Sequence, residues 1–418
     1  MLPGASMMRA MRSSKRSAIT AAAAIVAVYG APGLGAAVRA TPAASRILVG
    51  PVFQQVVPGR VPSFAWPLVG QAAVGVAGVG LLASSPDQRR VPIASLTKMM
   101  TALVVLGDHP LVPGQAGPRF TISQQDVQEW KRELRAGDSV VEVRAGEVLT
   151  EYQALEALLV PSADNIADRL ASWDAGTLGA FVGKMNALRR TFKLGATHYA
   201  DPSGLNPRSV STASDQAYVA ARLMTYPVVR AIVRSLRINL PVVGVLPNLN
   251  PALSVDGIIG VKGGFTSHAK HCLVTAAYRM RHAALVVSVT LGQPDPRAPA
   301  HIDEALLEAA TTSLERRRLI LAEPTADTHT VAARGVGVRL VAPGASATVV
   351  VWPGLVLHDT ISNRPAPTAR TNQTNDRRTG ARTVSVSSSW GELASFVAAR
   401  SDVTSGSAPG SHDNSMAK

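Results

Sequence analysis

Three short segments rich in β-branched and small apolar residues lie close together in this 418-residue chain, at residues 258–265, 272–279 and 284–291. Polar turns separate them, so they predict consecutive antiparallel strands. The run that follows, IDEALLEAATTSLERRRLIL from Ile302, has the pattern of one long amphipathic helix that would pack on the sheet. We therefore expect a fold of the mixed α/β (α+β) class.

Earlier segments supply further strands and helices for this fold. Residues 72–84, AAVGVAGVGLLAS, are apolar and spaced by glycine, which predicts a pair of short strands. Residues 151–160 and 165–173 have helical patterns on either side of a proline break. Thr212, followed three residues later by Asp215, predicts a capping box at the start of another helix.

The chain begins with a segment that has the layout of an export signal. Arg9, Arg12, Lys15 and Arg16 precede an uncharged, Ala- and Val-rich run over residues 17–38. The run has small residues suited to a cleavage site, and it is also about long enough to remain as a membrane anchor. N-terminal membrane association and cleavage both stay open.

The domain organisation follows from these patterns and from composition. We expect an export segment or anchor at 1–40, a linker at 41–62 and a large folded domain at 63–323. A small β-rich domain is expected at 324–400, with a polar insert inside it, and a disordered tail at 401–418.

Charge and cysteine content exclude several classes of protein. The net charge is +14, but residues 1–60 alone contain seven Lys or Arg and no Asp or Glu, so half of the excess lies outside the main domain. No nucleic-acid-binding motif accompanies it, and we expect no nucleic-acid partner. The single cysteine, Cys272, excludes an internal disulfide and a cysteine-rich metal site. It is expected to be a small buried residue.

The sequence Ser95-Leu96-Thr97-Lys98 stands at the front of an apolar, helix-like run. A serine needs a base within hydrogen-bond reach to act as a nucleophile, and a lysine three residues later lies on the same helix face. The pattern Ser-x-x-Lys occurs again at 267–270 and 415–418, but only the first leads into a long apolar run. Ser95 and Lys98 are therefore the candidate catalytic pair, and the alternative is a capped helix with a surface lysine.

Two further elements follow in a recognisable order. Ser162 lies in LLVPSADNIAD at the helix break, and Lys262 lies in GIIGVKGGFTS on an expected strand. With the first motif they resemble the Ser-x-x-Lys, Ser-x-Asn and Lys-Thr-Gly elements of penicillin-binding serine hydrolases. Together with GEVLTEYQALEALL and THYADPSGLNPRSVSTASD, they resemble the D-alanyl-D-alanine carboxypeptidase family of low-molecular-mass penicillin-binding proteins, of actinobacterial type, over about residues 65–320.

This resemblance implies an antiparallel sheet flanked by helices, a helical subdomain, and an active site between them. It also implies an exported enzyme that acts on peptidoglycan stem peptides and binds β-lactams, without a metal ion or organic cofactor. Ser95 would attack the penultimate D-alanine, Lys98 would take its proton, and Ser162 would relay a proton to the leaving amine.

The same resemblance implies which residues bind the substrate. Lys262 would attract the substrate carboxylate, and the backbone N–H groups of Ser95 and Phe265 would form the oxyanion hole. The expected substrate-binding residues are Asp164, Asn165, Lys262, Gly263, Gly264, Phe265 and Thr266.

Two positions depart from the family pattern. Asp164 stands where the family usually has Asn, and as a carboxylate it would pair with Lys98 and hold that amine protonated. Gly263 stands where the family usually has Thr, so one hydroxyl aimed at the substrate carboxylate is missing. Asn165 and Thr266 are the neighbours that would replace these groups.

Other functions remain as alternatives. One is a catalytically weakened homologue that binds wall peptides or a partner protein. Another is a β-lactamase, although no deacylating carboxylate is clearly placed in the sequence. His198, His268 and His271 form no ligand spacing for a metal, and Asp201 and Ser203 in DPSGL are expected to shape a turn.

Overall fold

The computed structural model describes residues 46–49, 54–254, 257–321, 339–340, 346–362, 382–388 and 391–398. The expected export segment, most of the polar insert and the C-terminal tail lie outside the described residues. Among the helices of the described part, none combines the length and apolar composition that crossing a bilayer requires.

A five-stranded antiparallel sheet forms the centre of the fold, in the order β11-β12-β13-β3-β4. Its strands are β3 (Gln71–Val76), β4 (Gly80–Ser84), β11 (Ile258–Thr266), β12 (Lys270–Arg279) and β13 (Ala284–Gln293). This confirms the strands predicted from the sequence. It also places β11, which carries Lys262, at an edge of the sheet.

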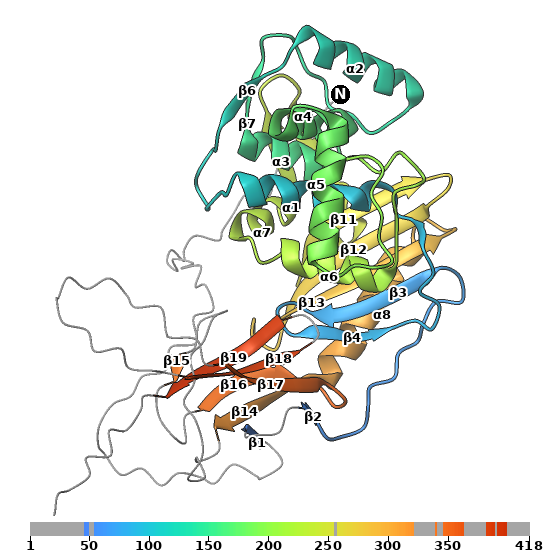
Figure 1. Cartoon of the computed structure of the whole chain (residues 1–418). Coiled ribbons are helices and arrows are strands. Elements are labelled where there is room, and N and C mark those ends of the chain that lie inside the picture. Colours follow the sequence, from blue (N-terminus) through green and yellow to red (C-terminus); the bar gives the residue numbers. More distant parts are fainter. Residues whose placement is uncertain are drawn as a thin grey trace, which may run out of the picture.

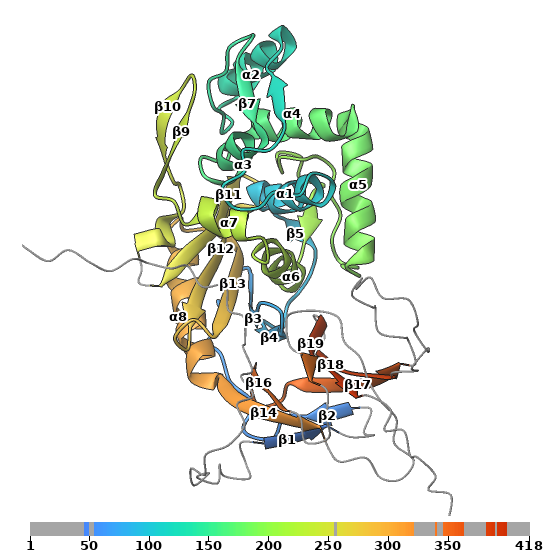
Figure 2. The same ribbon diagram turned by 90° about the vertical axis from the view of Figure 1, so that its left-hand side faces the viewer.

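Helices cover both faces of this sheet (Figure 2). On one face lies α8 (Ala298–Ser313), and on the other lie α6 (Ala213–Leu223) and, beyond it, α1 (Thr97–Asp108). A helical subdomain stands beyond α1 (Figure 1). The remaining helices are α2 (Gln124–Ala136), α3 (Glu151–Leu159), α4 (Asp164–Ala175), α5 (Leu178–Thr191), α7 (Pro227–Val233) and the short 3₁₀ turns η2 (Ala94–Leu96) and η3 (Pro251–Ser254).

Short strand pairs brace the connections between these helices. The pairs are β5 (Val91–Pro92) with β8 (Val210–Ser211), β6 (Arg119–Thr121) with β7 (Val148–Thr150), and β9 (Arg237–Leu240) with β10 (Gly244–Pro247).

The capping box predicted at the start of α6 forms only in part. The Thr212 hydroxyl accepts a hydrogen bond from the backbone N–H of Asp215 at 3.1 Å. The Asp215 carboxylate instead accepts from the Thr197 hydroxyl at 2.6 Å. The hydroxyl of Thr197 thus takes the place of the Thr212 backbone N–H as the donor to Asp215.

The long helix predicted through residue 321 is wrong in its second half. Helix α8 ends at Ser313, and β14 (Glu315–Leu321) follows as a strand. The apolar stripe of the helix stops where four charged residues begin at Glu315. The backbone of β14 is paired on both edges, with β1 (Arg46–Val49) and β16 (Ser346–Val351), which a helix could not provide.

The segment expected as a linker at 41–62 also contains strands. Besides β1 it holds β2 (Gln54–Val56), which pairs with β17 (Val356–Ser362). The sheet continues through β18 (Arg382–Ser388), β19 (Gly391–Ala398) and β15 (Arg339–Leu340). Residues from both ends of the described chain thus build two small sheets beside the central one.

Two clusters of buried apolar side chains hold these layers together. The larger one lies between the helices and one face of the sheet, and it includes Cys272, as the sequence predicts. The smaller one lies between the sheet, α8 and the C-terminal strands, and it includes Val57, Leu307 and Trp352.

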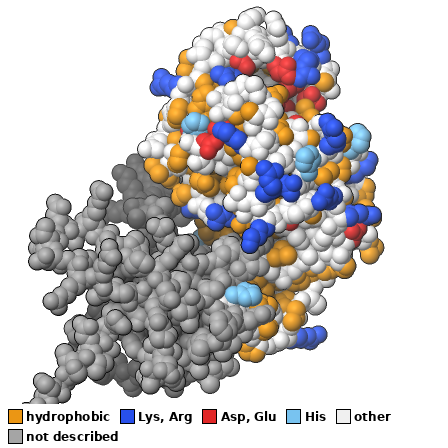
Figure 3. Space-filling view, viewed as in Figure 1, with side chains coloured by type: hydrophobic (Ala, Val, Ile, Leu, Met, Phe, Trp, Pro, Cys, Tyr) orange, Lys and Arg blue, Asp and Glu red, His pale blue; other side chains and the backbone are white. Residues whose placement is uncertain are grey.

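The charged side chains of the surface are distributed rather than gathered. Lys and Arg side chains are scattered over the described part of the face in Figure 3, and they form no continuous stripe on that face. The basic excess of the sequence therefore gives this face no extended groove for a polyanion.

A buried carboxylate fixes α8 to the sheet. Asp303 is fully buried and accepts hydrogen bonds from three buried hydroxyls of β12 and β13, those of Thr275 (3.2 Å), Ser288 (3.0 Å) and Thr290 (2.6 Å). Burial raises the pKa of Asp303 to about 7, while these hydroxyls oppose the shift.

We expect Asp303→Ala to lower the free energy of unfolding by about 3 kcal/mol or more, because three buried hydroxyls lose their acceptor at once. Glu304→Ala, at an exposed position one residue further along α8, should change it by less than about 0.5 kcal/mol. Urea denaturation followed by circular dichroism measures both. Equal costs for the two variants would contradict this role of Asp303.

Candidate active site

Ser95 lies on a single 3₁₀ turn directly before α1, and its side chain is partly accessible. The residue before it, Ala94, has a φ of 47°, in the left-handed region that non-glycine residues seldom adopt. A Cβ on Gly204, whose own φ is +94°, would lie 1.8 Å from the Ala94 carbonyl oxygen. The close approach of the loop around Gly204 thus requires glycine and helps to hold the strained turn that presents Ser95.

Lys98 is fully buried one turn after Ser95, and its amine is surrounded by acceptors. The Lys98 Nζ donates to Ser95 Oγ at 2.8 Å, to Asp164 Oδ1 at 2.6 Å and to the Ser203 carbonyl oxygen at 3.0 Å. An ammonium group has three donors, and all three are engaged here. Lys98 therefore lies between the candidate nucleophile Ser95 and a carboxylate, and it contacts both.

Asp164 begins α4 and binds two segments at once. Besides Lys98, its carboxylate accepts from the backbone N–H of Ser139 at 3.1 Å through the other oxygen, and its own N–H donates to the Ser139 carbonyl at 2.7 Å. Asn165 points elsewhere, because its side-chain amide bonds the backbone N–H and carbonyl of Val141 at 3.1 and 2.9 Å. Asn165 thus anchors residues 139–141 to α4 and does not contact Lys98.

Ser162 occupies the break between α3 and α4, as expected from the sequence. Its φ is 67°, again in the left-handed region, and it is 6% exposed. Ser162 itself and Ala94, the residue before Ser95, therefore both have strained backbone. Such strain is common at functional sites.

The edge strand β11 closes the site opposite Ser95. A Cβ on Gly264 would lie 2.9 Å from the Ser95 backbone nitrogen and 3.2 Å from the Ala94 Cβ, so only glycine allows this approach. Lys262 is buried, and its amine donates to the Gly263 carbonyl at 2.9 Å. Burial, and secondarily the charge of Lys98, holds the pKa of Lys262 well below its usual range.

The remaining predicted residues of β11 differ in their surroundings. Gly263 has room for a side chain, since the nearest atom to an added Cβ is a Leu273 methyl at 3.8 Å. The Phe265 ring is 57% exposed and stacks on His271 with centroids 4.4 Å apart. The Thr266 hydroxyl accepts from the Ala269 N–H at 3.0 Å, so it caps the turn that follows the strand.

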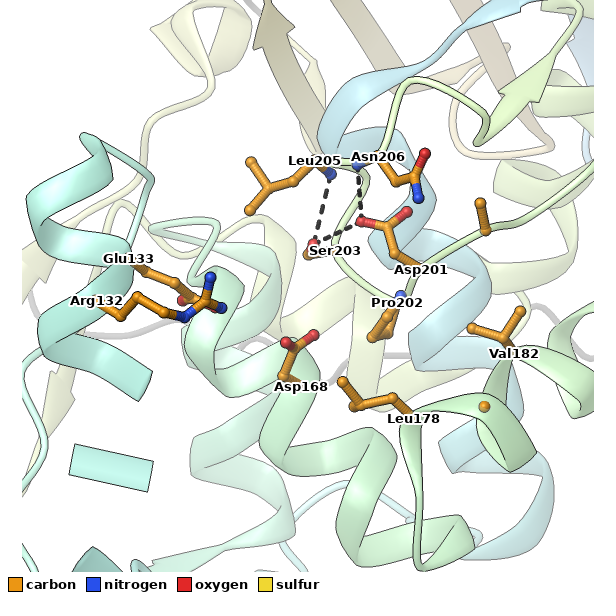
Figure 4. Close-up of a pocket in the computed structure, with 12 residues that line it drawn as sticks. Arg132, Glu133, Asp168, Leu178, Val182, Asp201, Pro202, Ser203, Leu205 and Asn206 are labelled. Carbon is orange, nitrogen blue, oxygen red and sulfur yellow. Dashed lines mark hydrogen bonds and ion pairs between the residues drawn. The ribbon is translucent and has the colours of Figure 1, made fainter. Parts of the chain in front are cut away.

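The loop at residues 201–206 supplies a partner that the sequence did not reveal. The Asp201 carboxylate accepts from the Ser203 hydroxyl and the Gly204 N–H at 2.8 Å each, and from the Asn206 N–H at 3.2 Å (Figure 4). Asp201 therefore shapes the turn, as predicted. The turn aims the Ser203 carbonyl at Lys98, and no side-chain pattern could signal a contact made by a backbone oxygen.

A cavity of about 490 Å³ borders this loop on the side of α2 and α4. Glu133 and Asp168 line it (Figure 4). Burial and nearby carboxylates, Asp168 first, raise the pKa of Glu133 to about 8. Burial and nearby carboxylates, Asp201 first, raise that of Asp168 to about 7. This cluster was not predicted from the sequence, although acidic residues spaced four apart along α2 and α4 were a signal for it.

The Ser-x-x-Lys pattern at 267–270 does not resemble this site. Ser267 is exposed in the turn between β11 and β12, where its hydroxyl lies 3.4 Å from the ring of His268, and Lys270 is exposed as well. The pattern at 415–418 lies outside the described residues.

Known proteins resemble the part of the chain that carries these motifs. The sequence profile of peptidase family S11, D-alanyl-D-alanine carboxypeptidase, matches residues 74–295, which is more than half of the chain. A D-alanyl-D-alanine carboxypeptidase of Bacillus subtilis is 26% identical over 253 residues, 58% of this chain and 63% of the relative. This chain therefore spans less than two thirds of that relative.

Two further matches concern a Streptomyces protein. A D-alanyl-D-alanine carboxypeptidase of Streptomyces sp. strain K15 is 30% identical over 219 residues, 48% of this chain and 73% of the relative. The crystal structure of the Streptomyces K15 DD-transpeptidase matches with a TM-score of 0.54 and 26% identity, over 61% of this chain and 100% of that one. The profile match and the shared fold show that this chain belongs to the S11 family of D-alanyl-D-alanine carboxypeptidases.

Proposed function

We propose that this chain is an exported serine D,D-carboxypeptidase that removes the terminal D-alanine from peptidoglycan stem peptides through an acyl-enzyme. The observation that carries the proposal is the 2.8 Å contact between Lys98 Nζ and Ser95 Oγ, at a strained turn that faces the edge strand β11. Family membership supports the same reaction.

In this reaction Ser95 Oγ attacks the carbonyl carbon of the penultimate D-alanine, and the bond to the nitrogen of the last D-alanine breaks. The backbone N–H groups of Ser95 and Phe265 would stabilise the oxyanion. Water then hydrolyses the ester and frees Ser95. Ser162, at the helix break beside Asp164, would relay the proton that the leaving amine requires.

The proton of Ser95 needs an acceptor, and Lys98 can serve only after giving up one of its own protons. Asp164, 2.6 Å from the Lys98 amine, is the neighbouring group placed to receive it. The carboxylate also stabilises the charged amine. Proton transfer from Ser95 is therefore the step that Asp164 makes costly.

Lys262 is suited to recognise the substrate carboxylate. Its buried amine has only the Gly263 carbonyl as a hydrogen-bond acceptor among the described residues. A substrate carboxylate beside it would supply the missing negative charge and favour the ammonium form. Binding of the substrate carboxylate and protonation of Lys262 would then favour each other.

The alternatives differ from this proposal in what the site must contain. A β-lactamase needs a carboxylate free to activate water at the acyl ester, whereas Asp164 is engaged by Lys98 and by the Ser139 N–H. A weakened homologue is supported by the three engaged donors of Lys98 and by the missing hydroxyl at Gly263. We propose slow turnover rather than loss of activity, because Ser95 and Lys98 remain in contact.

We expect a fluorescent penicillin to acylate the full chain at Ser95, since among the described serines only Ser95 combines a contacting lysine with this strained turn. Labelling should disappear in Ser95→Ala and persist in Ser267→Ala, which removes the serine of the second Ser-x-x-Lys pattern. Mass spectrometry of the adduct locates the label, and release of D-alanine from diacetyl-Lys-D-Ala-D-Ala tests the reaction. Undiminished labelling of Ser95→Ala would refute the assignment, and rapid loss of the label would indicate a β-lactamase.

Asp164→Asn should raise the rate of acylation by about ten-fold, because the charged form of Lys98 loses its partner and a larger fraction of the amine is neutral and able to accept the proton of Ser95. The same change should lower the free energy of unfolding by up to about 3 kcal/mol, since a buried ion pair is broken. Stopped-flow labelling with penicillin and urea denaturation measure the two effects. Asp87→Asn, at an exposed ion pair with Arg89, is the matched control. Slower acylation in Asp164→Asn would mean that Asp164 is needed to accept the proton.

Gly263→Thr should also speed acylation, by about ten-fold, because a hydroxyl that bonds a carboxylate contributes about 1.5–3 kcal/mol. A Cβ at position 263 would lie no closer than 3.8 Å to any residue other than its chain neighbours, so β11 tolerates the first atom of a side chain there. Gly263→Val, of similar shape but without the hydroxyl, should give no gain. If the valine and threonine variants respond alike, the missing hydroxyl is not what limits the wild type.

A further inference from the structure

Three carboxylates converge at the mouth of the cavity beside the 201–206 loop. Glu129 and Glu133 stand one turn apart on α2, and Asp168 faces them from α4. One oxygen from each residue lies within 4.8 Å of the others. Figure 4 shows Glu133 and Asp168 directed into the space between these helices.

Glu133 is the member that marks this cluster as more than a solvated acidic surface. Its side chain is 2% exposed, and its Oε2 atom has no hydrogen-bond partner among the described residues. Its other oxygen forms a long ion pair, at 3.7 Å, with the Arg132 guanidinium. A buried carboxylate oxygen without a donor is costly, and a bound cation would remove that cost.

Arg132 does not neutralise the cluster. It donates to Glu129 through two nitrogens, and its side chain is 64% exposed. Asp168 has no side-chain hydrogen bond or ion pair with the described part of the chain. With all groups ionised, the three carboxylates and Arg132 leave a formal charge of −2, which equals the charge that one divalent cation supplies.

The number and arrangement of the carboxylate ligands indicate which divalent cation would bind. Calcium binds oxygen ligands at about 2.3–2.6 Å, so ligands on opposite sides of the ion are about 5 Å apart. Magnesium binds at about 2.0–2.1 Å, which brings opposite ligands to about 4 Å. The oxygen separations, all within 4.8 Å, are compatible with calcium, and a set of three carboxylates favours calcium over magnesium, which usually keeps several waters and binds one or two carboxylates. The cavity leaves room for the water ligands that complete the shell.

We propose that Glu129, Glu133 and Asp168 form a binding site for a calcium-sized divalent cation between α2 and α4. The ion takes no part in the chemical reaction. It joins two helices of the helical subdomain, one of which begins at Asp164 beside the catalytic lysine.

Calorimetric titration of calcium chloride into the chelator-treated full chain tests the site directly. One binding site is expected, with magnesium binding more weakly. Glu133→Gln and Asp168→Asn should each weaken calcium binding by at least about ten-fold, because each removes a charged ligand. Glu304→Gln, on the exposed side of α8, should bind as the wild type does. Arg132→Gln should bind more tightly, since the competing guanidinium is gone.

Thermal unfolding gives a second readout that does not depend on peptidase activity. Calcium should raise the unfolding temperature of the wild type and of Ser95→Ala, because a ligand that binds only the folded state stabilises it. At the same calcium concentration the unfolding temperature of Glu133→Gln and of Asp168→Asn should rise much less. Without calcium both variants should unfold at or above the temperature of calcium-free wild type, because an unpaired negative charge is gone. Absence of binding up to about 10 mM calcium, or equal binding by both variants and the wild type, would overturn the proposal.

Discussion

The site depends on one buried ion pair, between Lys98 and Asp164. A lysine without any exposed surface can stay charged only if every donor finds an acceptor, and here the acceptors come from three separate segments of the chain. The 3₁₀ turn, the start of α4 and the 201–206 loop must all be in place for the ammonium to be stable. The pair therefore couples the packing of the helical subdomain to the position of Ser95, the proposed nucleophile.

The two buried lysines of the site, Lys98 and Lys262, have different surroundings. Lys98 has a carboxylate, a hydroxyl and a carbonyl, whereas Lys262 has only the carbonyl of Gly263 among its described contacts. Burial accordingly lowers the pKa of Lys262. Lys98 thus has a carboxylate partner within the protein, and in the proposed function a substrate carboxylate would supply one for Lys262.

Sequence patterns predicted what depends on residue type and missed what depends on the backbone. The five strands of the central sheet and the contact of Ser95 with Lys98 follow from periodicity and helical spacing. The Ser203 carbonyl was not foreseeable, because every residue has a carbonyl. The end of α8 at Ser313 was missed because β14 is fixed by strands far away in the sequence, and local propensity carries no record of such partners.

The pairing of β1 with β14 has a consequence for the order in which the chain folds. Residues 46–49 lie beside residues 318–321, so the first described strand finds its partner only after the whole peptidase region has been made. Contacts between such distant segments form slowly, because a long loop must close before they bring any gain. The two small sheets should thus form last during folding and open first during unfolding. Their backbone amide hydrogens should therefore exchange with solvent faster than those of the central sheet.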